Sequence, residues 1–591
     1  MPLPLDLYVS ILEHLPAERV EYKGGVSTLV NCLRANTLLR EAALVPSLWE
    51  HHYRVRYLHD EHVNKSSPEA SNWRLIYAER RRQDNLALHL LNEIVSQREG
   101  RCRRAATLAA FSFDVWDVLD IECSLPVPAV FGSNSTAMVA PHALTRRFWA
   151  SSILEAISRR SAIVQWGSLA NRDTNHSVSF VDAFSSLSCF FGQPPQKTPS
   201  LLLELGNLCH GYLVKHQCCL DPEMPEYNLP DICTKICQFM HDQNFGPVQS
   251  TQFYDISNHF PHLYLTTNKL SIPISLVHIF VSIARHPAIG VPASPVEFPA
   301  RVLVHVSSPP GADDFLVDVY GAQTKPILSL RNDIPTMLLR LGVPPDNLSQ
   351  YVSPCGAAPM LLRAARNILS SFRNDASRST TQSAIYAAVC IHLLLTNETQ
   401  LVGHMLSHLD LDPIATATFL SDLLPLLRQG CRNLLETACR STLELEDQQA
   451  ALVHPRTEEV HIAHYVGMVF EHRSYYYIGC IIGWEPTCLA TEEWQTTMNV
   501  GNLTRGADQP FYHIVSLDGA ERYVAEDNIN PIALTADLAL QFFQELPVLP
   551  KYFSDADIGR GRWQLSPELQ RAYPDDQHDE SDDIHSIVKT T

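Results

Sequence analysis

The sequence predicts a multidomain, mainly α-helical chain with an α+β centre and a small β-barrel near its C-terminal end. A length of 591 residues is too great for a single hydrophobic core and suggests several domains. Apolar residues recur at helical spacing through most of the chain. By contrast, residues 464–529 are rich in aromatic and β-branched residues interrupted by glycines, a composition typical of short twisted strands joined by turns.

The composition favours a protein that works among other proteins inside the cell. The formal net charge of -19 disfavours broad contact with nucleic acid, because that affinity rests on Lys and Arg side chains that neutralise phosphates. The longest apolar runs, residues 273–284 and 385–395, are roughly half of the ~20 residues that a membrane span requires. The N-terminal stretch lacks a secretory pattern. We therefore expect an intracellular protein of the cytoplasm or nucleus, with protein partners and no membrane contact.

The first 60 residues predict three short amphipathic helices. One face of the first helix collects four apolar side chains: Leu5, Val9, Leu12 and Leu15. Pro4 stands at its start, where the missing N–H of proline costs nothing. A second helix is expected over residues 29–39, and a third begins at Pro46. Three short helices cannot bury all this apolar surface alone, so part of it is expected to contact a partner.

The same region resembles the F-box family in its opening Leu3-Pro4-Leu5-Asp6-Leu7, its middle Val30-Asn31-Cys32-Leu33-Arg34-Ala35-Asn36 and its closing Leu48-Trp49-Glu50. The first connection, residues 17–27, is longer than is usual in that family. The resemblance implies docking to the Skp adaptor of an SCF ubiquitin ligase, and through it to the cullin. The adaptor-binding residues that it implies are Pro4, Leu5, Leu7, Ile11, Leu12, Leu15, Leu33 and Trp49. A plain helical bundle is the alternative.

After a helical connector over residues 61–175, residues 176–375 predict an α+β domain. A buried helix runs through Ala284, and two β-branched runs, 302–306 and 315–320, predict paired strands. This order resembles the SirB-type transglutaminase-like domain, whose pattern places a helix, a strand entry and a strand end in the same sequence. The resemblance implies that the domain shares this fold.

Catalysis in such a domain requires a thiol at the helix start, a histidine that deprotonates it and a carboxylate that orients the histidine. The matched positions carry Ile274, Arg301 and Asp318. An isoleucine cannot attack a carbonyl, and an arginine cannot act as a base near neutral pH. Nearby polar residues are more economically explained as satisfied groups of an inactive fold: Ser271, Ser275, His278 and His305. We expect no catalytic residues and no enzyme activity, with a residual transglutaminase- or protease-like activity as the alternative.

Three further segments follow. Residues 380–445 predict paired helices that resemble a degenerate tetratricopeptide unit, and residues 458–533 predict the small β-domain. The remaining segment, 534–591, predicts a helix and an acidic end that we expect to be disordered; the acidic residues are Asp575, Asp576, Asp579, Glu580, Asp582 and Asp583.

The β-domain resembles the YccV-like family in four motifs that occur in the family's order: Gly479-Cys480-Ile481-Ile482-Gly483-Trp484, Glu493-Trp494, Asp508-Gln509-Pro510-Phe511-Tyr512 and Tyr523-Val524-Ala525-Glu526-Asp527-Asn528-Ile529. Bacterial members are described as binding hemimethylated DNA or as protease-specificity factors. Residues 461–532 contain three basic and nine acidic side chains, a balance that repels phosphate. The aromatic side chains are therefore expected to build core and a protein-binding patch rather than to stack on bases. The substrate-binding residues that we expect are Trp484, Trp494, Phe511 and Tyr512.

No metal site and no cofactor are expected. The 15 cysteines show no framework spacing, and many lie in apolar segments where a free thiol behaves as a small hydrophobe. The densest group of Cys and His residues comprises Cys209, His210, His216, Cys218, Cys219, Cys233 and Cys237. Structural zinc sites usually pair ligands with two to four intervening residues. Cys233 and Cys237 have that spacing, but Cys209-His210 and Cys218-Cys219 are adjacent pairs on apolar or helical segments.

The order of modules resembles a family of F-box proteins that combines a SirB-type domain with a YccV-like domain. That resemblance implies a substrate-recognition subunit of an SCF ubiquitin ligase, which brings target proteins near the transfer centre and makes no bond with its own side chains. The alternatives are a DNA-binding regulatory protein that acts through the YccV-like domain, and the residual enzyme.

Overall fold

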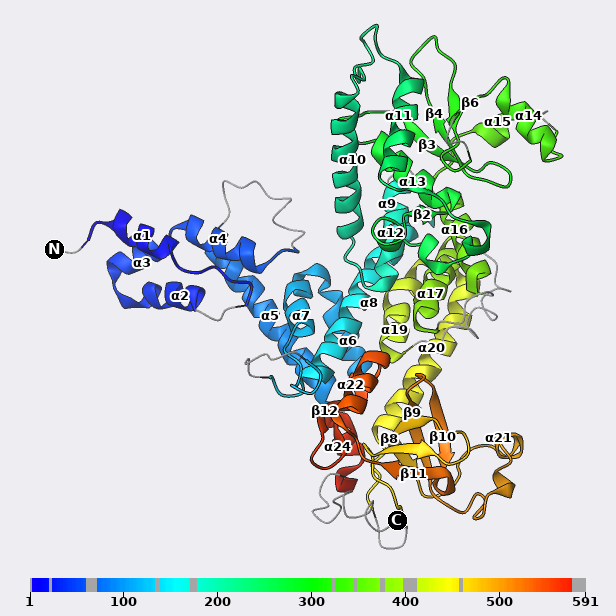
Figure 1. Cartoon of the computed structure of the whole chain (residues 1–591). Helices are drawn as coiled ribbons and strands as arrows, with labels where there is room; N and C mark the ends of the chain where they lie inside the picture. Colours follow the sequence, from blue (N-terminus) through cyan, green and yellow to red (C-terminus); the bar gives the residue numbers. More distant parts are fainter. Residues whose placement is uncertain are drawn as a thin grey trace. The chain divides into compact units, whose positions relative to one another are not determined.

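The structure is a computed structural model of the chain (Figure 1), and it describes residues 3–20, 24–59, 72–132, 139–170, 178–321, 325–344, 348–372, 378–396, 412–456 and 461–576. The chain divides into two compact units. The first comprises residues 1–154 and 442–591, and the second comprises residues 155–441. Within the described ranges, no helix is both long and apolar enough to cross a lipid bilayer.

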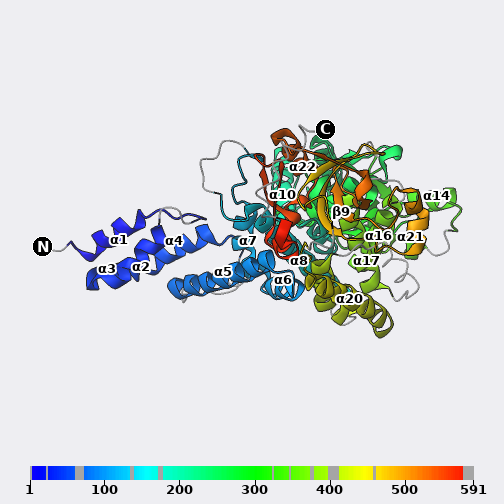
Figure 2. The same ribbon diagram turned by 90° about the horizontal axis from the view of Figure 1, so that it is seen from below.

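The first unit begins with four helices that lie side by side (Figure 1, Figure 2): α1 (Leu5–Glu13), α2 (Gly25–Ala35), α3 (Thr37–Ala43) and α4 (Pro46–Arg56). The single helix expected over residues 29–39 is two helices. The break falls at Asn36, whose extended backbone ends α2 and whose side chain accepts the Leu39 N–H at 2.9 Å to cap α3. Pro46 occupies the first turn of α4, as expected.

A connector of helices follows: α5 (Trp73–Ser96), α6 (Arg101–Ala110), α7 (Trp116–Cys123) and the first part of α8 (Ala143–Ala170). A buried polar contact joins the end of α4 to α5. The Arg56 guanidinium and the Tyr57 hydroxyl both donate to Asp84 Oδ2, at 2.9 and 3.1 Å. Trp73 and Tyr77 of α5 complete the hydrophobic core of the N-terminal helices. The N-terminal helices and α5 therefore share one packed interior.

The β-domain of the first unit is a five-stranded antiparallel sheet in the order β10-β9-β8-β7-β11. Its strands are β7 (Val469–His472), β8 (Ile478–Glu485), β9 (Phe511–Ser516), β10 (Glu521–Ala525) and β11 (Ile529–Ile532), and a short α21 (Glu492–Thr497) lies between β8 and β9. A bulge between Ile481 and Gly483 bends β8 against β9. The two edge strands, β10 and β11, are joined by a single turn, and no pairing between them occurs in the described residues. The predicted closure into a barrel is thus not confirmed.

The sheet's core continues into a C-terminal segment with more structure than expected. It contains α22 (Ala536–Glu545), α23 (Leu549–Tyr552), β12 (Phe553–Asp557), β13 (Arg562–Leu565) and α24 (Pro567–Ala572). Phe542, Phe553 and Trp563 join the core of the β-domain. The β12–β13 hairpin was not predicted, because its strands are short and carry more polar than apolar residues.

The acidic end is only partly as expected. Asp576 is buried, and its carboxylate accepts the Val466 N–H at 2.7 Å and the Trp484 indole N–H at 3.2 Å. The same carboxylate pairs with the Arg456 guanidinium at 2.6 Å. Disorder from residue 575 onward was therefore the wrong expectation for Asp575 and Asp576, and the reason is that three donors converge on one carboxylate. The other acidic residues of this end lie outside the described residues.

The second unit has a four-stranded antiparallel sheet, in the order β3-β4-β5-β6, against which α13 (Pro273–Ala284) packs. The strands are β3 (Ala293–Val296), β4 (Leu303–Val306), β5 (Phe315–Val317) and β6 (Ile327–Ser329). The helix α13 is buried almost all round, and Pro273 opens it. The strand expected over residues 315–320 ends at Val317, because Asp318 turns the chain by accepting the backbone N–H groups of Tyr320 and Gly321.

Other helices surround this core. They are α9 (Phe180–Ser185), α10 (Lys197–Lys215), α11 (Leu229–Asp242), α12 (Pro261–Tyr264), α14 (Asp333–Arg340), α15 (Leu348–Val352), α16 (Ala357–Phe372), α17 (Arg378–Leu395), α19 (Pro413–Thr418) and α20 (Gln429–Ala450), together with the short strands β1 (Gly246–Pro247) and β2 (Leu270–Ser271). Residues 397–411, part of the paired helices expected over residues 380–445, lie outside the described residues. The chain is helical again after Asp412, whose side chain accepts the Ala415 N–H at 2.8 Å to cap α19.

Candidate functional site

The helix α1 presents apolar side chains to solvent. Leu7 is 49% exposed and Ile11 is 57% exposed, and four residues apart they lie on the same helix face. Leu3 and Leu5 are exposed beside them, and so is Pro4. We call Leu5, Leu7 and Ile11 of α1, together with Leu3 just before the helix, the α1 apolar face. A cluster of exposed aliphatic side chains on and beside one short helix is a feature of binding surfaces.

The other predicted adaptor-binding residues belong to the interior. Leu12 is 5% exposed and Trp49 is 3% exposed, and the Trp49 indole N–H donates to the Ala43 carbonyl at 2.7 Å. Leu15 and Leu33 are half-buried and pack against the same core. These four side chains hold α1 against the core, whereas the remaining predicted adaptor-binding residues, Pro4, Leu5, Leu7 and Ile11, are exposed to solvent.

The positions matched to a catalytic triad in the transglutaminase-like fold hold an ion pair and a buried aliphatic side chain. Ile274 is buried at the start of α13. Arg301 donates to Asp318 Oδ2 at 2.9 Å, so the site expected for a histidine–aspartate pair holds an arginine–aspartate pair. Asp318 Oδ1 is occupied by two backbone N–H groups. Ser271 and Ser275 both donate to the Asn258 carbonyl, at 2.9 and 2.6 Å.

The histidines near this fold are buried. His278 is fully buried, with Nδ1 beside the Tyr264 hydroxyl at 2.8 Å and Nε2 beside the Val181 carbonyl at 3.0 Å. Burial lowers the pKa of His278 to about 4. His259 is 2% exposed, and burial lowers its pKa to about 3. His305 pairs with Asp314 at 3.3 Å on the strand pair β4–β5. Each ring is thus engaged in holding the fold.

A large cavity lies over the β-domain in the first unit, and we call it the aromatic groove. It has a volume of about 1450 Å³. Its sheet side is formed by β8, β9 and β10, including His513 and Tyr523, and a loop before β8 contributes Tyr475, which is 77% exposed. Trp494 on α21 and the exposed Leu452 complete the apolar lining. A hollow of this size with an aromatic lining suits a peptide or a small ligand.

The four predicted substrate-binding aromatics all line this region or support it, in different ways. Trp494 is half-buried, and its ring meets the Tyr523 ring edge-on with centroids 5.6 Å apart. Trp484 is buried and held by Asp576, although its edge reaches the groove. Phe511 is buried beneath α21, with an edge at the groove. Tyr512 is fully buried on the other face of the sheet, where its hydroxyl donates to Glu526 at 2.6 Å, so the expectation that it contacts substrate is wrong.

The alternation of side chains along a strand explains this outcome. Neighbours on β9 point to opposite faces, so Phe511 and His513 face outward when Tyr512 faces the core. Sequence reasoning missed Tyr523 and His513 as groove residues. The sequence did hold one signal for this surface: His513 is a polar residue at an outward position in an otherwise apolar strand.

A carboxylate sits in the groove among these aromatic side chains. The Tyr523 hydroxyl donates to Glu485 Oε2, and His513 Nε2 lies 3.4 Å from Oε1. Burial alone would raise the pKa of Glu485, but the hydrogen bonds from His513 and Tyr523 outweigh it and hold the pKa below its usual value. Glu485 is therefore charged at neutral pH.

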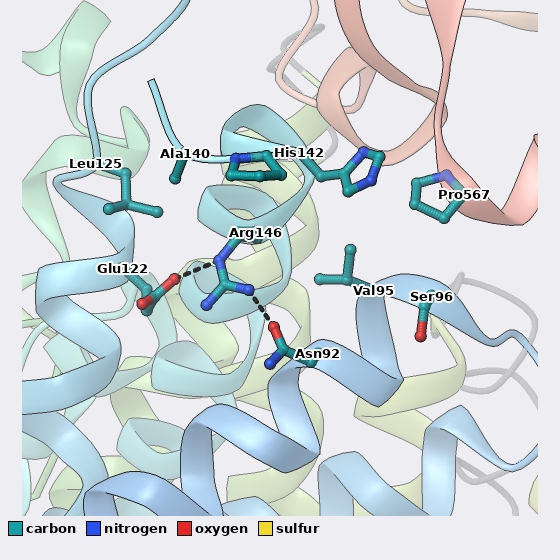
Figure 3. A pocket seen from close by; sticks show the side chains of 10 residues that line it. Asn92, Val95, Ser96, Glu122, Leu125, Ala140, His142, Arg146 and Pro567 are labelled. Atoms are coloured by element: carbon teal, nitrogen blue, oxygen red, sulfur yellow. Dashed lines mark hydrogen bonds and ion pairs between the residues drawn. The ribbon is translucent and has the colours of Figure 1, made fainter. Parts of the chain in front are cut away.

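A smaller cavity of about 460 Å³ lies where α5, α7, α8 and α24 meet (Figure 3). Arg146 stands in it with its guanidinium between Glu122 and Asn92, donating to both, and the Glu122 contact measures 2.7 Å. His142 and Pro567 face it from the other side (Figure 3). The charges of Arg146 and Glu122 neutralise each other. The aromatic groove is therefore the stronger candidate for a ligand-binding site.

Among the described residues, no group of three or more His, Cys, Asp or Glu side chains is arranged to hold a metal ion. Cys233 and Cys209 are buried within the core of the second unit. Burial raises the pKa of Cys209 to about 12, which keeps the thiol protonated.

Comparison with known proteins identifies two domain classes. The family described as hemimethylated DNA-binding protein YccV like matches residues 462–560, and the transglutaminase-like superfamily matches residues 215–363. The chain is thus a multidomain protein with a transglutaminase-like domain and a YccV-like domain. Both resemblances drawn from the sequence are confirmed.

The chain is also similar to individual known proteins. The chain is similar to F-box only protein 21 of Mus musculus and of Homo sapiens, with 24% identity over 359 residues in each case. The match covers 57% of this chain and 54% of each relative, so the chain spans about half the length of the curated relatives it matches. The resemblance to that family, predicted from the order of modules, is confirmed. No solved structure matches the chain significantly.

Proposed function

We propose that this protein is a substrate-recognition subunit of an SCF-type ubiquitin ligase. Residues 1–60 attach to the Skp adaptor, and through it to the cullin, whereas the rest of the chain holds target proteins. The observation that carries the proposal is the α1 apolar face, which leaves four aliphatic side chains in solvent at the N-terminal end of a chain similar to F-box only protein 21. Such a role belongs in the cytoplasm or nucleus.

The buried contact between α4 and α5 supports this role. Arg56 and Tyr57 both bind Asp84, and the two helices share an aromatic core, so the adaptor-binding helices are joined firmly to the following connector. A ligase subunit acts by holding its target near the transfer centre, and that proximity effect requires a stiff connection.

We propose further that the transglutaminase-like domain is a non-catalytic scaffold. The triad positions carry Ile274, Arg301 and Asp318, and the Arg301–Asp318 ion pair leaves no free base there. An acyl-transfer assay with an amine donor and a glutamine peptide is expected to stay at background. Turnover that exceeds background and disappears in an Asp318→Ala variant would contradict this part of the proposal.

The aromatic groove is the proposed site for targets. Charge argues against DNA as its ligand, because Arg505 is paired with Glu526 and Asp527, and Arg522 is paired with Asp518. Two of the three arginines of residues 461–532 are therefore already neutralised. Binding to duplex DNA with a steep salt dependence would favour the DNA-binding alternative.

A co-purification experiment tests the adaptor role. The full chain, expressed with an affinity tag in cells, is expected to retain the Skp adaptor and the cullin. A Leu7→Glu/Ile11→Glu variant is expected to lose both, because two charges replace exposed apolar contacts. Leu12 is unsuited to this test, since it is buried and its replacement would damage the fold. A Leu203→Glu/Leu208→Glu variant, changed at similarly exposed positions on α10, is the matched control and should retain both partners. Absence of both partners from the unchanged chain would overturn the proposal.

A further inference from the structure

The strand β10 forms one side of the aromatic groove and has an open edge. All five of its residues, Glu521–Ala525, line the groove. It pairs with β9 on one side, and on the other no strand pairs with it within the part of the chain that the structure describes. An edge strand of this kind carries unpaired backbone N–H and C=O groups and is a template for another strand.

The register identifies which backbone groups are free. The Ser516 N–H donates to the Ala520 carbonyl at 3.1 Å, and the Glu526 N–H donates to the Pro510 carbonyl at 2.9 Å. These contacts fix the hydrogen-bonded pairs of β9 and β10 at the even-numbered residues of β10, because such pairs alternate along an antiparallel ladder. The N–H and C=O groups of Glu521, Tyr523 and Ala525 therefore point away from β9, along the open edge.

The side chains of the same alternate residues belong to the outer face of the sheet. Tyr523 stacks on His513 with ring centroids 4.8 Å apart and donates its hydroxyl to Glu485. Glu521 is exposed and accepts a hydrogen bond from the Tyr552 hydroxyl at 2.8 Å. A strand added at the edge would place every second side chain beside Glu521 and Tyr523 on the groove face.

The charged side chains on the groove face favour a ligand that carries a positively charged group. Among the described residues, Glu485 has only His513 as an ion-pair partner, and Glu521 forms no ion pair. The arginine of the same strand is neutralised, since Arg522 pairs with Asp518. The groove's other cationic side chains, Arg98, Lys551 and Arg571, come from outside the sheet, and Arg98 is bound by Glu446 and Glu568. Glu485 is bonded to the Tyr523 hydroxyl, and Glu521 lies two residues from Tyr523 on the same face of β10. Two carboxylates on this aromatic face suit a Lys or Arg side chain, which an aromatic ring also attracts.

We propose that the aromatic groove binds an extended peptide that pairs as an added strand with the edge of β10 and places a Lys or Arg side chain against Glu485, Glu521 and Tyr523. The inference rests on the proposed function and names the class of target that this site recognises. Main-chain pairing supplies affinity, and the alternate side chains supply selectivity. A segment with a basic residue in an extended region meets both requirements.

Binding of peptide libraries to the full chain tests this inference. The probes are four fluorescein-labelled mixtures of acetylated heptapeptides with Arg, Lys, Glu or Ala fixed at the central position, measured by fluorescence anisotropy. The Arg and Lys mixtures are expected to bind at least tenfold more tightly than the Glu mixture. Methylation of alternate backbone nitrogens in the Arg mixture is expected to weaken binding at least tenfold, because it blocks strand pairing and leaves the protein unchanged.

Protein variants locate the site. Glu485→Gln/Glu521→Gln is expected to bring the Arg and Glu mixtures within threefold of each other. Glu471→Gln/Glu545→Gln changes the net charge equally at positions outside the groove lining and should preserve the preference. Any one of four results would overturn the inference. They are equal binding of the Arg and Glu mixtures, binding that backbone methylation does not weaken, no binding of any mixture, and competition by duplex DNA alone. Adaptor binding by the same preparation separates the two ideas: its loss with peptide preference intact contradicts only the ligase role.

Discussion

Replacement of Asp576 by asparagine tests the physical basis of the aromatic groove. The carboxylate of Asp576 accepts from Val466 and Trp484 and pairs with Arg456 at 2.6 Å, all in a buried setting. Asparagine keeps the size of the side chain and removes its charge. The change leaves the mostly buried Arg456 guanidinium without its carboxylate partner. The Cζ atom of this guanidinium also lies 3.9 Å from the centroid of the Tyr465 ring.

The expected cost follows from these contacts. Removal of one partner from a buried ion pair costs roughly 3–5 kcal/mol, and the amide oxygen of asparagine retains part of the bonding to the neutral donors. We therefore expect the β-domain to lose about 3 kcal/mol of stability against local opening. Because 1.4 kcal/mol corresponds to a factor of ten, amides of β7 and β8 should exchange with solvent on the order of 100-fold faster.

Hydrogen exchange read by mass spectrometry measures this effect strand by strand, which suits a chain whose several domains preclude a single unfolding transition. Asp575→Asn is the matched control. Asp575 is exposed, and among the described residues it accepts only the Arg456 backbone N–H, at 2.8 Å, so its replacement should change exchange less than tenfold. Equal exchange in β8 for the Asp576→Asn variant and the unchanged chain would refute the idea that this residue anchors the sheet.

Three further predictions concern other parts of the fold. Burial lowers the folded-state pKa of His278 to about 4 from 6.5, so the stability of the second unit should fall by on the order of 3 kcal/mol as pH drops from 6.5 to 4. Hydrogen exchange of α13, corrected for the pH dependence of intrinsic exchange, should show this loss, and a His278→Gln variant should lose less stability over the same pH range. Asp84→Ala leaves a buried arginine of α4 unpaired and should cost roughly 3–5 kcal/mol, seen as lost protection of α4 in hydrogen exchange; unchanged protection would contradict the role of that ion pair. A Cβ at Gly483 would lie 2.6 Å from the Tyr573 hydroxyl, so Gly483→Ala should destabilise the β-domain by about 1–3 kcal/mol in the same measurement, whereas Gly501→Ala, with open space around it, should not.

The sequence predicted the kinds of elements well because periodicity reports burial directly. The β-branched run around β8 and the apolar run of α13 have the structures expected of them. In α1, spacing identified an amphipathic helix but could not say how its apolar residues divide. Leu12 faces the core while Leu7 and Ile11 face solvent, and only the packing of the other three helices decides this.

The candidate site was harder to predict because it depends on contacts between distant segments. Trp484 and Trp494 look alike in sequence, yet Trp484 is buried by the remote Asp576 whereas Trp494 stands on a short helix at the groove. Asp576 itself was masked by the acidic composition around it. Tyr523 gains its place in the groove through a hydrogen bond to Glu485, a residue 38 positions away.

Direct binding of the purified full chain to purified Skp adaptor, measured by titration calorimetry, tests the central claim most directly. A one-to-one complex is expected, with affinity reduced at least 100-fold by Leu7→Glu/Ile11→Glu and unchanged by Leu203→Glu/Leu208→Glu. No heat of binding from the unchanged chain, or equal affinity of the α1 variant, would contradict the assignment of the α1 apolar face as the ligase attachment site.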